Sequence, residues 1–416
     1  MWKLTKVAAV AAALAAAVAA HAGEVEVLHY WTSGGEAKSA AELKKMMQAK
    51  GHTWRDFAVA GGGGDSAMTV LKSRVISGNP PSAAQVKGTA IQEWASEGVL
   101  GNMDALAKSE KWDEALPKVV ADVMKYKGNY VAAPVNVHRV NWIWASSDAL
   151  KKAGVAAMPK TWDEFFAAAD KLKAAGLIPV AHGGQNWQDF TTFESVVLGV
   201  GGPKFYQDAL VKLDDKALTS DTMKKSLETF RRIKTYTDPG APGRDWNLAT
   251  AMLIQGKAGF QLMGDWAKGE FIAAGKAPGK DFMCAAAPGT ANAFTFNVDS
   301  FILFKLKDAA AQKAQSDLAS AIMSPGFQEV FNLNKGSIPV RAGQSMDKFD
   351  DCAKASAKDF ADTAKSGGLV PSVAHGMAIA PATEGAIKDA VSQFWNDDKV
   401  SVADAMKKIA TAAKTK

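Results

Sequence analysis

The sequence predicts an α/β protein of two lobes, in which strands and helices alternate along the chain. Short strand-like segments are each followed by a turn and a helix-like segment, and 416 residues are enough for two domains of ordinary size. Hydrophobic residues make up 48% and charged residues 22% of the chain. That balance excludes a disordered tail, a collagen-like repeat and a protein with many membrane spans.

The first region repeats the order strand, short loop, helix. Its predicted elements are a strand at 24–30, a helix at 37–50, a strand at 54–60, a helix at 65–77, a strand at 83–87 and a helix from 91. This order is typical of a right-handed parallel sheet, in which ligand sites gather at the carboxyl ends of the strands. Trp31, the four glycines at 61–64 and Lys87 all lie at such ends.

A second region begins near residue 130 with an extended stretch that runs to 142. Further on, Thr161 is followed three residues later by Glu164, which is the signature of a capping box at a helix start. The chain is then mostly helical to about 287, and a strand-like run at 294–304 is long enough to cross back to the first region. We find no repeat and no low-complexity linker, so two lobes joined by extended crossings are expected.

The first 22 residues are expected to be a secretory signal peptide. Lys3 and Lys6 precede a short apolar run, and Ala20-His21-Ala22 has the small-residue pattern of a cleavage site after Ala22. The mature chain is therefore expected to be exported. The basic and acidic residues of the full chain are interspersed, so its net charge of +6 indicates solubility and argues against a nucleic-acid partner.

The chain has two cysteines, Cys284 and Cys352. In an oxidising compartment they could form a disulfide, and the alternative is a pair of buried thiols that act as small hydrophobic residues. The sequence leaves both alternatives open, because a disulfide depends on the distance between the two Cα atoms.

The motifs of several enzyme classes are missing. The chain contains neither glycine-rich nucleotide fingerprint and no serine nucleophile elbow. Its six histidines are scattered, without the spacing of a zinc site. No cofactor and no metal are therefore expected.

Tryptophan is unusually frequent, with twelve residues against five tyrosines. Trp31, Trp187 and Trp266 lie beside glycines, amides and acids, outside apolar runs. An indole face in such a setting can stack on the C–H side of a pyranose, although a large aromatic residue is more often part of a core. Trp162 and Trp395 lie in helical apolar patterns, where the core interpretation is favoured.

Three segments resemble those of the periplasmic sugar-binding components of ABC transporters. They are Tyr30-Trp31-Thr32-Ser33-Gly34-Gly35-Glu36, Met263-Gly264-Asp265-Trp266-Ala267 and Asn334-Lys335-Gly336-Ser337-Ile338-Pro339-Val340. The resemblance covers essentially the whole mature chain and is strongest for the glucose-binding members of Pseudomonas type. It implies a periplasmic location, a monomer, and the two-lobed periplasmic binding protein fold, in which mostly parallel sheets flanked by helices are joined by a hinge of three crossings. The expected lobes are 23–133 with about 298–342, and 134–297 with about 343–416.

The resemblance also implies the ligand contacts. Trp31 and Trp266 would stack against the sugar ring, and five polar side chains would hydrogen-bond its hydroxyls: Glu36, Lys87, Asp299, Lys335 and His375. Tyr30 stands where related proteins often have a second tryptophan, and is a further candidate. Simpler roles remain open for some of them, since Glu36 could cap a helix, Lys87 and Lys335 could be solvated loop charges, and His375 could cap a turn.

The expected function is capture of glucose between the lobes and its delivery to a membrane permease. Another hexose, a disaccharide or a polyol are alternative ligands. A different class of function is a glycosidase that uses Glu36 and Asp299 as its carboxylate pair. Lys87 and Lys335 would keep both carboxylates ionised, which disfavours a general acid, so no enzymatic activity is expected.

Overall fold

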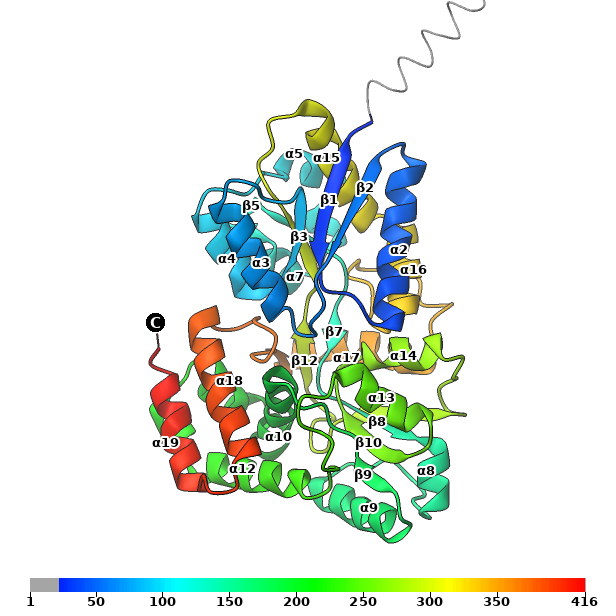
Figure 1. The fold of residues 1–416 in the computed structure, drawn as a ribbon, viewed down its shortest axis with the longest axis vertical. Coiled ribbons are helices and arrows are strands. Elements are labelled where there is room, and N and C mark those ends of the chain that lie inside the picture. The colour runs from blue at the N-terminus through cyan, green and yellow to red at the C-terminus, as the bar shows by residue number, and fades with distance from the viewer. Residues whose placement is uncertain (1–21, 416) are drawn as a thin grey trace, which may run out of the picture.

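The computed structural model describes residues 22–415, which form two α/β lobes stacked along the long axis of the molecule (Figure 1). The two-lobed α/β fold predicted from the sequence is confirmed. The signal peptide predicted over 1–22 lies outside the described residues, apart from Ala22. Within 22–415, every helix falls short of the length or apolar character needed to cross a bilayer.

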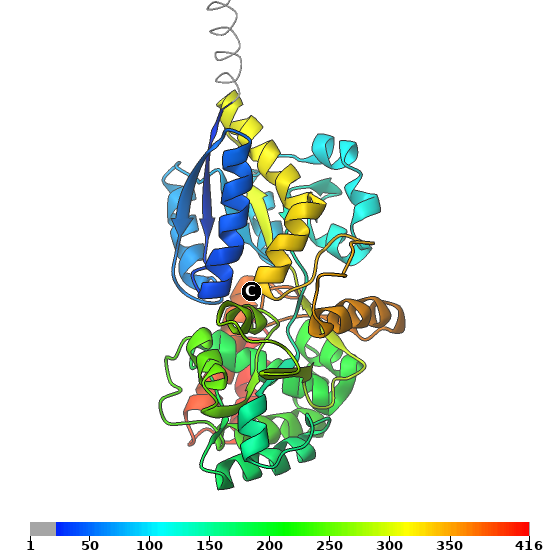
Figure 2. The ribbon, with the colours of Figure 1, turned by 90° about the vertical axis from the view of Figure 1, so that its right-hand side faces the viewer.

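The upper lobe in Figure 1 is built on a five-stranded sheet in the order β2-β1-β3-β13-β6. Its strands are β1 (Glu24–His29), β2 (Thr53–Ala58), β3 (Ala83–Val86), β6 (Ala132–Pro134) and β13 (Ser300–Leu303). The helices α2 (Gly34–Ala49), α15 (Ala309–Met323) and α16 (Pro325–Lys335) pack together on one side, and α3 (Asp65–Ile76) and α4 (Gly88–Ser96) lie on the other (Figures 1 and 2). The lobe is completed by α5 (Asp104–Ser109), α6 (Trp112–Ala115), α7 (Lys118–Val123), β4 (Lys125–Tyr126) and β5 (Asn129–Tyr130).

The lower lobe has a four-stranded sheet in the order β11-β8-β10-β9. Its strands are β8 (Trp142–Ser146), β9 (Ile178–Val180), β10 (Ala258–Leu262) and β11 (Phe282–Ala286). Its helical elements are α8 (Ser147–Lys152), α9 (Trp162–Ala174), α10 (Asn186–Tyr206), the π-helical turn η1 (Gln207–Val211), α11 (Asp215–Leu218), α12 (Asp221–Lys234), α13 (Trp246–Ile254), α14 (Ala267–Ala273), α18 (Pro381–Asn396) and α19 (Val402–Ala412). The predicted capping box is present at the start of α9, where Thr161 Oγ1 accepts from the Glu164 amide at 3.2 Å and Glu164 Oε2 accepts from the Thr161 amide at 3.3 Å.

Each sheet contains a single strand that runs against the others. β13 is antiparallel to β3 and β6, and β8 is antiparallel to β10 and β11. Both reversed strands begin just after the chain has crossed from the other lobe. Strands such as β1 and β3 end at the boundary between the lobes, whereas a chain that arrives from the other lobe starts at that boundary and runs away from it. In both of these sheets all strands but one run in the same direction, as the prediction of mostly parallel sheets requires. The crossings explain the two reversed strands.

Three stretches of chain cross between the lobes side by side. Residues 135–137 lead from β6 to β7 (His138–Arg139), residues 298–299 join β12 (Phe294–Asn297) to β13, and residues 336–350 lead from α16 to α17 (Asp351–Ser366). The Val135 amide donates to the Asp299 carbonyl at 2.8 Å, and Val137 and Ile338 exchange backbone hydrogen bonds of 2.9 and 3.1 Å. Beside the crossings, β12 pairs with both β7 and β14 (Leu369–Pro371). The residue boundaries given above for the two lobes stay a prediction.

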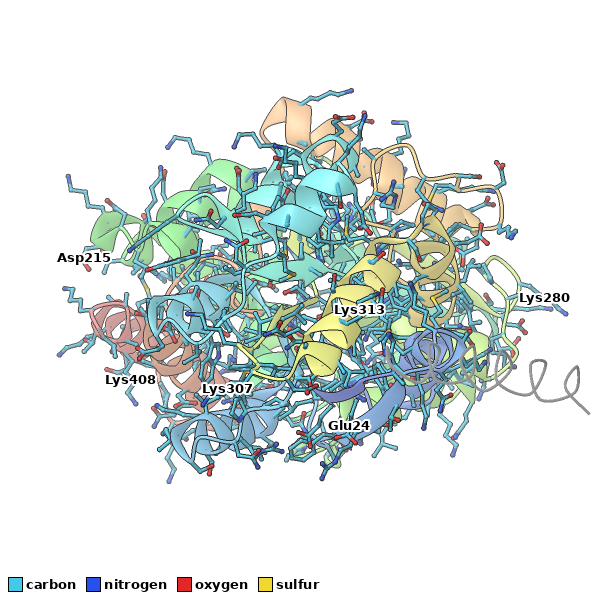
Figure 3. The ribbon with its side chains drawn as sticks, turned by 90° about the horizontal axis from the view of Figure 1, so that it is seen from above. Glu24, Asp215, Lys280, Lys307, Lys313 and Lys408 are labelled. Atoms are coloured by element: carbon cyan, nitrogen blue, oxygen red, sulfur yellow. A yellow bond between two sulfur atoms is a disulfide. The ribbon has the colours of Figure 1, made fainter. Side chains whose placement is uncertain are left out.

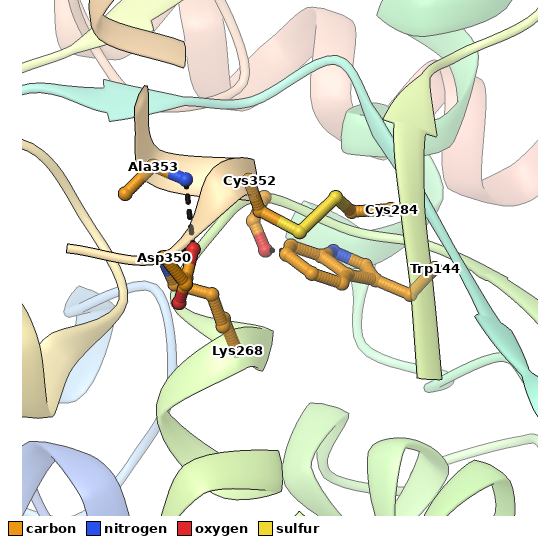
Figure 4. Close-up of a disulfide and its surroundings, with 7 residues drawn as sticks. Trp144, Lys268, Cys284, Asp350, Cys352 and Ala353 are labelled. Carbon is orange, nitrogen blue, oxygen red and sulfur yellow. Dashed lines mark hydrogen bonds and ion pairs between the residues drawn. A yellow bond between two sulfur atoms is a disulfide. The ribbon is translucent and has the colours of Figure 1, made fainter. Parts of the chain in front are cut away.

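Cys284 of β11 and Cys352 of α17 form a disulfide (Figure 4), so the first of the two alternatives is correct. Their Cα atoms lie 6.2 Å apart, and 68 positions separate them in the sequence. Next to the disulfide, Lys268 of α14 pairs with Asp350 at 3.0 Å, and the same carboxylate accepts from the Ala353 amide at the start of α17. The end of the third crossing is therefore fastened to the lower lobe.

Charged side chains of both signs extend from the surface (Figure 3). Several form ion pairs one helical turn apart, such as Lys118 with Asp122 at 2.5 Å and Lys358 with Asp362 at 2.6 Å. This agrees with the interspersed charges of the sequence. Exposed pairs of this kind contribute little to stability, so the lobes depend on their apolar cores.

Replacing both cysteines, as Cys284→Ser with Cys352→Ser, should lower the free energy of unfolding by about 2–5 kcal/mol, because the disulfide restricts the unfolded chain. Urea unfolding followed by tryptophan fluorescence measures the change, with the reduced wild-type protein as the control. The prediction is contradicted if the double variant unfolds at the same urea concentration and with the same slope as the oxidised wild type.

Candidate functional site

The two lobes border a partly open cavity at their boundary. We call it the interlobe cavity. Its lining comes from both lobes and from the crossings: Tyr30, Glu36, Gly62, Gly63, Lys87, His138, Trp187, Trp246, Trp266, Asn297, Asp299, Lys335 and His375. Seven of the eight side chains singled out from the sequence are thus brought together, namely Tyr30, Glu36, Lys87, Trp266, Asp299, Lys335 and His375.

Trp31 is the exception, and the structure corrects the expectation that its indole stacks on a ligand. The residue is only 2% exposed and packs edge-on against Phe301, with ring centroids 5.5 Å apart, and at a tilt against Phe331 at 5.1 Å. Successive side chains of extended chain point to opposite sides, so when Tyr30 faces the cavity its neighbour turns into the core of the upper lobe.

Two aromatic residues of the cavity were absent from the predicted set. Trp187, near the start of α10, lies 6.3 Å from Trp266 between ring centroids, and Trp246 begins α13. Trp187 was singled out from the sequence for the same kind of polar neighbours as Trp266, but the resemblance did not include it among the expected ligand contacts. The local sequence of Trp246 offers no feature that separates it from a core residue.

The glycine loop brings the backbone of the upper lobe against these indoles. A Cβ atom at Gly62 would lie 3.0 Å from ring atoms of both Trp187 and Trp246. At Gly63, where φ is +86°, it would lie 2.9 Å from Trp187. Gly62 and Gly63 are therefore required by a close approach of backbone to aromatic rings, and a larger residue at either position would hold the lobes apart here.

A buried histidine, also missed by the sequence analysis, organises the charges of the cavity. His138 Nε2 lies 2.9 Å from Asp299 Oδ2, and its Nδ1 hydrogen-bonds Asp265. Burial alone would lower the pKa of His138, but the two carboxylates outweigh burial and raise it. In turn, burial would raise the pKa of Asp299, but the charges of His138, Lys335 and Lys87 hold it well below its usual range. The cluster is thus an imidazolium between two carboxylates.

Glu36 and Lys335 form an ion pair at the edge of the cavity, with 2.5 Å between Oε1 and Nζ. Glu36 lies in the first turn of α2, and Lys335 is the last residue of α16, which Gly336 ends with a φ of +93°. Both side chains are largely buried, with exposed fractions of 12% and 3%. Neither is a solvated surface charge, and both line the cavity.

Three other polar groups of the cavity are available to a ligand. Among residues 22–415, Tyr30 Oη and Asn297 Oδ1 are buried without a hydrogen bond. Lys87 Nζ lies 5.5 Å from the centroid of the Tyr30 ring, and burial lowers the pKa of Lys87. Burial and nearby carboxylates raise the pKa of Tyr30, which therefore keeps its hydroxyl proton. A ligand with several hydroxyl groups could satisfy all three side chains.

His375 is held in one protonation state. Burial, followed by Lys87 and Lys388, keeps the pKa of His375 well below its usual value, so the ring is neutral. The Thr191 hydroxyl donates to the Trp187 carbonyl at 2.8 Å, so it accepts from His375 Nε2–H at 3.1 Å. We infer that Nδ1 of His375 carries the lone pair and is a hydrogen-bond acceptor.

The His138 cluster predicts a pH optimum of stability. The raised pKa of His138 stabilises the folded state fully below the ordinary value of 6.5, and this stabilisation is lost as the pH rises through the raised pKa. The lowered pKa of Asp299 stabilises the folded state above the ordinary value of 3.8, and this stabilisation is lost as the pH falls through the lowered pKa. The free energy of unfolding of the wild type, relative to a His138→Gln variant, should therefore be largest between about 4 and 6.5 and fall in alkaline solution. Chemical unfolding from pH 4 to pH 10 measures it, and a difference that does not change with pH contradicts it.

Comparison with known proteins agrees with this architecture. Residues 31–320 match the model of the bacterial extracellular solute-binding protein family. A probable sugar-binding periplasmic protein of Brucella suis is 48% identical over 420 residues, which cover 99% of both chains, and one of Rhizobium meliloti is 49% identical over 399 residues, 96% of both. A chitin oligosaccharide binding protein shares the fold, with a TM-score of 0.79 at 18% identity over 94% of this chain and 98% of its own. The chain therefore belongs to the bacterial extracellular solute-binding protein family.

Proposed function

We propose that this protein is the periplasmic sugar-binding component of an ABC importer, and that it captures glucose between its lobes and delivers it to the membrane permease. The observation that carries the proposal is one cavity that combines indole walls with ionised and unpartnered polar groups from both lobes. The names of the two bacterial relatives support the sugar ligand and the periplasmic location. The protein would act as a monomer, without a cofactor.

In this proposal the indoles of Trp266 and Trp187 contact the C–H faces of the ring, and the polar side chains bind its hydroxyls. Micromolar affinity requires about −8 kcal/mol, or about −0.7 kcal/mol for each of about twelve heavy atoms of a hexose. This value is high for a molecule that water already solvates well. Hydrogen bonds to ionised groups contribute about 1.5–3 kcal/mol against about 1 kcal/mol for neutral ones, so ionised partners help to reach it.

The charges of the site favour a neutral ligand. Three cationic groups balance three carboxylates around the cavity: Lys87, His138 and Lys335 against Glu36, Asp265 and Asp299. A sugar phosphate or a sugar acid would add an unbalanced negative charge to a buried site, at a high cost in free energy. A neutral sugar adds none.

Glucose is favoured by the resemblance to Pseudomonas-type glucose-binding members. Calorimetric titration with D-glucose, D-galactose, D-mannose, maltose and sorbitol decides among the candidate ligands. Glucose is expected to bind at least about tenfold more tightly than the others, a difference of about 1.4 kcal/mol. Preference for another member of the panel would replace glucose and leave the sugar-binding role in place.

The proposal is one of binding without catalysis. Glu36 is paired with Lys335, and neighbouring cations hold the pKa of Asp299 low, so neither is suited to be a protonated general acid. Incubation with aryl glycosides should therefore release no phenol. Turnover that Glu36→Gln abolishes would instead identify a glycosidase.

The substitution Trp266→Ala should weaken glucose binding by about 1–3 kcal/mol, because it removes one aromatic wall of the cavity. Trp94→Ala is the matched control. Trp94 packs against Phe304, with ring centroids 6.0 Å apart, and does not line the cavity. Calorimetry measures both affinities, and thermal melting checks that each variant is folded. Equal titration curves for Trp266→Ala and wild type would remove the stacking role.

Closure of the lobes brings α2 of the upper lobe against α14 of the lower lobe (Figure 1). The Gly35 amide donates to Glu270 Oε1 at 2.9 Å, and a Cβ atom at Gly35 would lie 2.7 Å from the Gly269 carbonyl carbon. At the neighbouring Gly34, a Cβ atom would meet nothing closer than 3.5 Å.

Gly35→Ala should therefore hinder closure and weaken glucose binding at least about tenfold, since overpacking costs about 1–3 kcal/mol. Gly34→Ala is the control and should bind nearly as the wild type does. Calorimetry measures affinity, and small-angle scattering with saturating glucose should show a larger radius of gyration for Gly35→Ala. Equal affinities for the two variants contradict the prediction.

A further inference from the structure

A buried carboxylate in α10 holds the segment 372–376, which carries one of the cavity residues. Glu194 is 0% exposed. Its carboxylate accepts hydrogen bonds from Ser372 Oγ at 2.6 Å, from the amides of Val373 at 2.9 Å and Ala374 at 3.2 Å, and from Tyr206 Oη at 2.8 Å. Three of these four donors belong to the segment, so this one side chain is the acceptor for three of its polar groups.

The same segment contacts both the cavity and the other lobe. His375 lines the interlobe cavity. The Gly376 carbonyl accepts from the Thr89 amide at 2.9 Å, and Thr89 Oγ1 lies within hydrogen-bond distance of the Gly376 and Ile379 carbonyls, at 3.2 and 2.7 Å. Thr89 lies in the first turn of α4, in the upper lobe. A Cβ atom at Gly88 would lie 2.1 Å from the Gly376 oxygen, so the two backbones meet closely.

The spacing of three residues along α10 connects the cavity with the segment 372–376. Trp187, Thr191 and Glu194 follow each other at intervals of four and three residues, which places them on one face of the helix. That face supplies an aromatic wall of the cavity, the hydrogen-bond partner of His375 and the acceptor for the segment.

We propose that Glu194 is a positioning residue for sugar capture, which holds residues 372–376 so that His375 faces the ligand and Gly376 receives Thr89 when the lobes close. This inference rests on the proposed function and names a residue that acts on the site from beneath it. Burying a carboxylate without a charged partner is costly, and an apolar side chain would fill the same space at less cost. The carboxylate is explained if the backbone amides of the segment need an acceptor in this place.

The protonation of Glu194 gives the inference a distinctive signature. Burial raises the pKa of Glu194 to about 7, although its four hydrogen-bond donors oppose the change. Protonation removes acceptor capacity, so sugar affinity should decrease as the pH falls through this value. Tyr206 and His375 face the same region and stay neutral, because burial raises the pKa of the first and lowers that of the second. Glu384 and Lys388 of α18, and Asp65 and Lys87 of the upper lobe, are charged groups on the far side of the segment.

The test compares Glu194→Gln with Asp189→Asn, a matched neutralisation on the same helix. Asp189 is also 0% exposed, but its carboxylate bonds His182, Ser392 and Asn396 and makes no hydrogen bond to residues 372–376. Both variants lose a buried charge, so both report the general effect on stability. Only Glu194→Gln replaces one of the two oxygens that accept from the segment by an NH₂ donor.

Two measurements separate positioning from stability. In the protein without sugar, deuterium exchange of a peptide covering 371–377 should be faster in Glu194→Gln and unchanged in Asp189→Asn. At pH 8, Glu194→Gln should weaken D-glucose binding at least about tenfold, and Asp189→Asn less than about threefold. As the pH is lowered from 8 to 6, the glucose affinity of the wild type should decrease toward that of Glu194→Gln. The affinity of the variant should not change over that range.

The inference is overturned if deuterium exchange of the peptide in Glu194→Gln equals that of the wild type. It is also overturned if exchange is faster but the variant binds glucose as tightly as the wild type does. If the wild type itself binds no D-glucose, it is the proposed ligand that fails. The exchange measurement, which needs no sugar, then still decides whether Glu194 positions the segment, and the sugar that the wild type does bind takes the place of glucose in the titrations.

Discussion

A buried imidazolium between two carboxylates determines how the three crossings and the lower lobe meet. His138 begins β7 directly after the first crossing, Asp299 belongs to the second crossing, and Asp265 follows β10 in the lower lobe. Asn136 adds the third crossing, because its side-chain amide donates to Asp299 at 3.3 Å and to Ser337 Oγ at 3.1 Å. A charge left alone in this interior would be strongly destabilising, so these segments are stable only when they lie together. His138 and Asp299 also line the cavity, so this cluster fixes the position of two of its charged side chains.

Around this centre, small residues set how closely the lobes can approach. Gly62 and Gly63 meet the indoles of the lower lobe, Gly35 meets Gly269, and Gly88 meets the carbonyl of Gly376. In each place a side chain would collide with backbone or with a ring that is fixed by its own packing. The contacts between the lobes are thus made largely by backbone, while the charged and aromatic side chains of the boundary are left to face the cavity. Two polar groups of the cavity, Tyr30 Oη and Asn297 Oδ1, are left buried there without a hydrogen bond from the described part of the chain.

Much of the fold and of the site could be predicted, because residues that follow the carboxyl ends of parallel strands lie close together in space. Tyr30 and Lys87 follow the carboxyl ends of β1 and β3, and these ends meet at one edge of a sheet. The prediction that Trp31 faces the ligand was wrong by one position, because successive side chains of an extended chain point to opposite sides. His138 could not be found in this way, because its partners lie 127 and 161 residues away and its neighbours in sequence are ordinary. The disulfide was undecided for a similar reason, since only the folded chain brings two cysteines 68 positions apart to a Cα separation of 6.2 Å.

The disulfide also changes the mechanical connectivity of the molecule. Between Cys284 and Cys352 the chain leaves the lower lobe, forms β13, α15 and α16 in the upper lobe and returns, so the covalent ring passes through both lobes. A pulling force applied at the two termini cannot extend the chain within that ring. With 68 positions enclosed, about 230 Å of contour length stays hidden from such a force until the bond is reduced. Stretched from its ends, the oxidised protein is therefore a shorter tether than its sequence implies, and its two lobes remain joined by a closed ring after every other contact between them has broken.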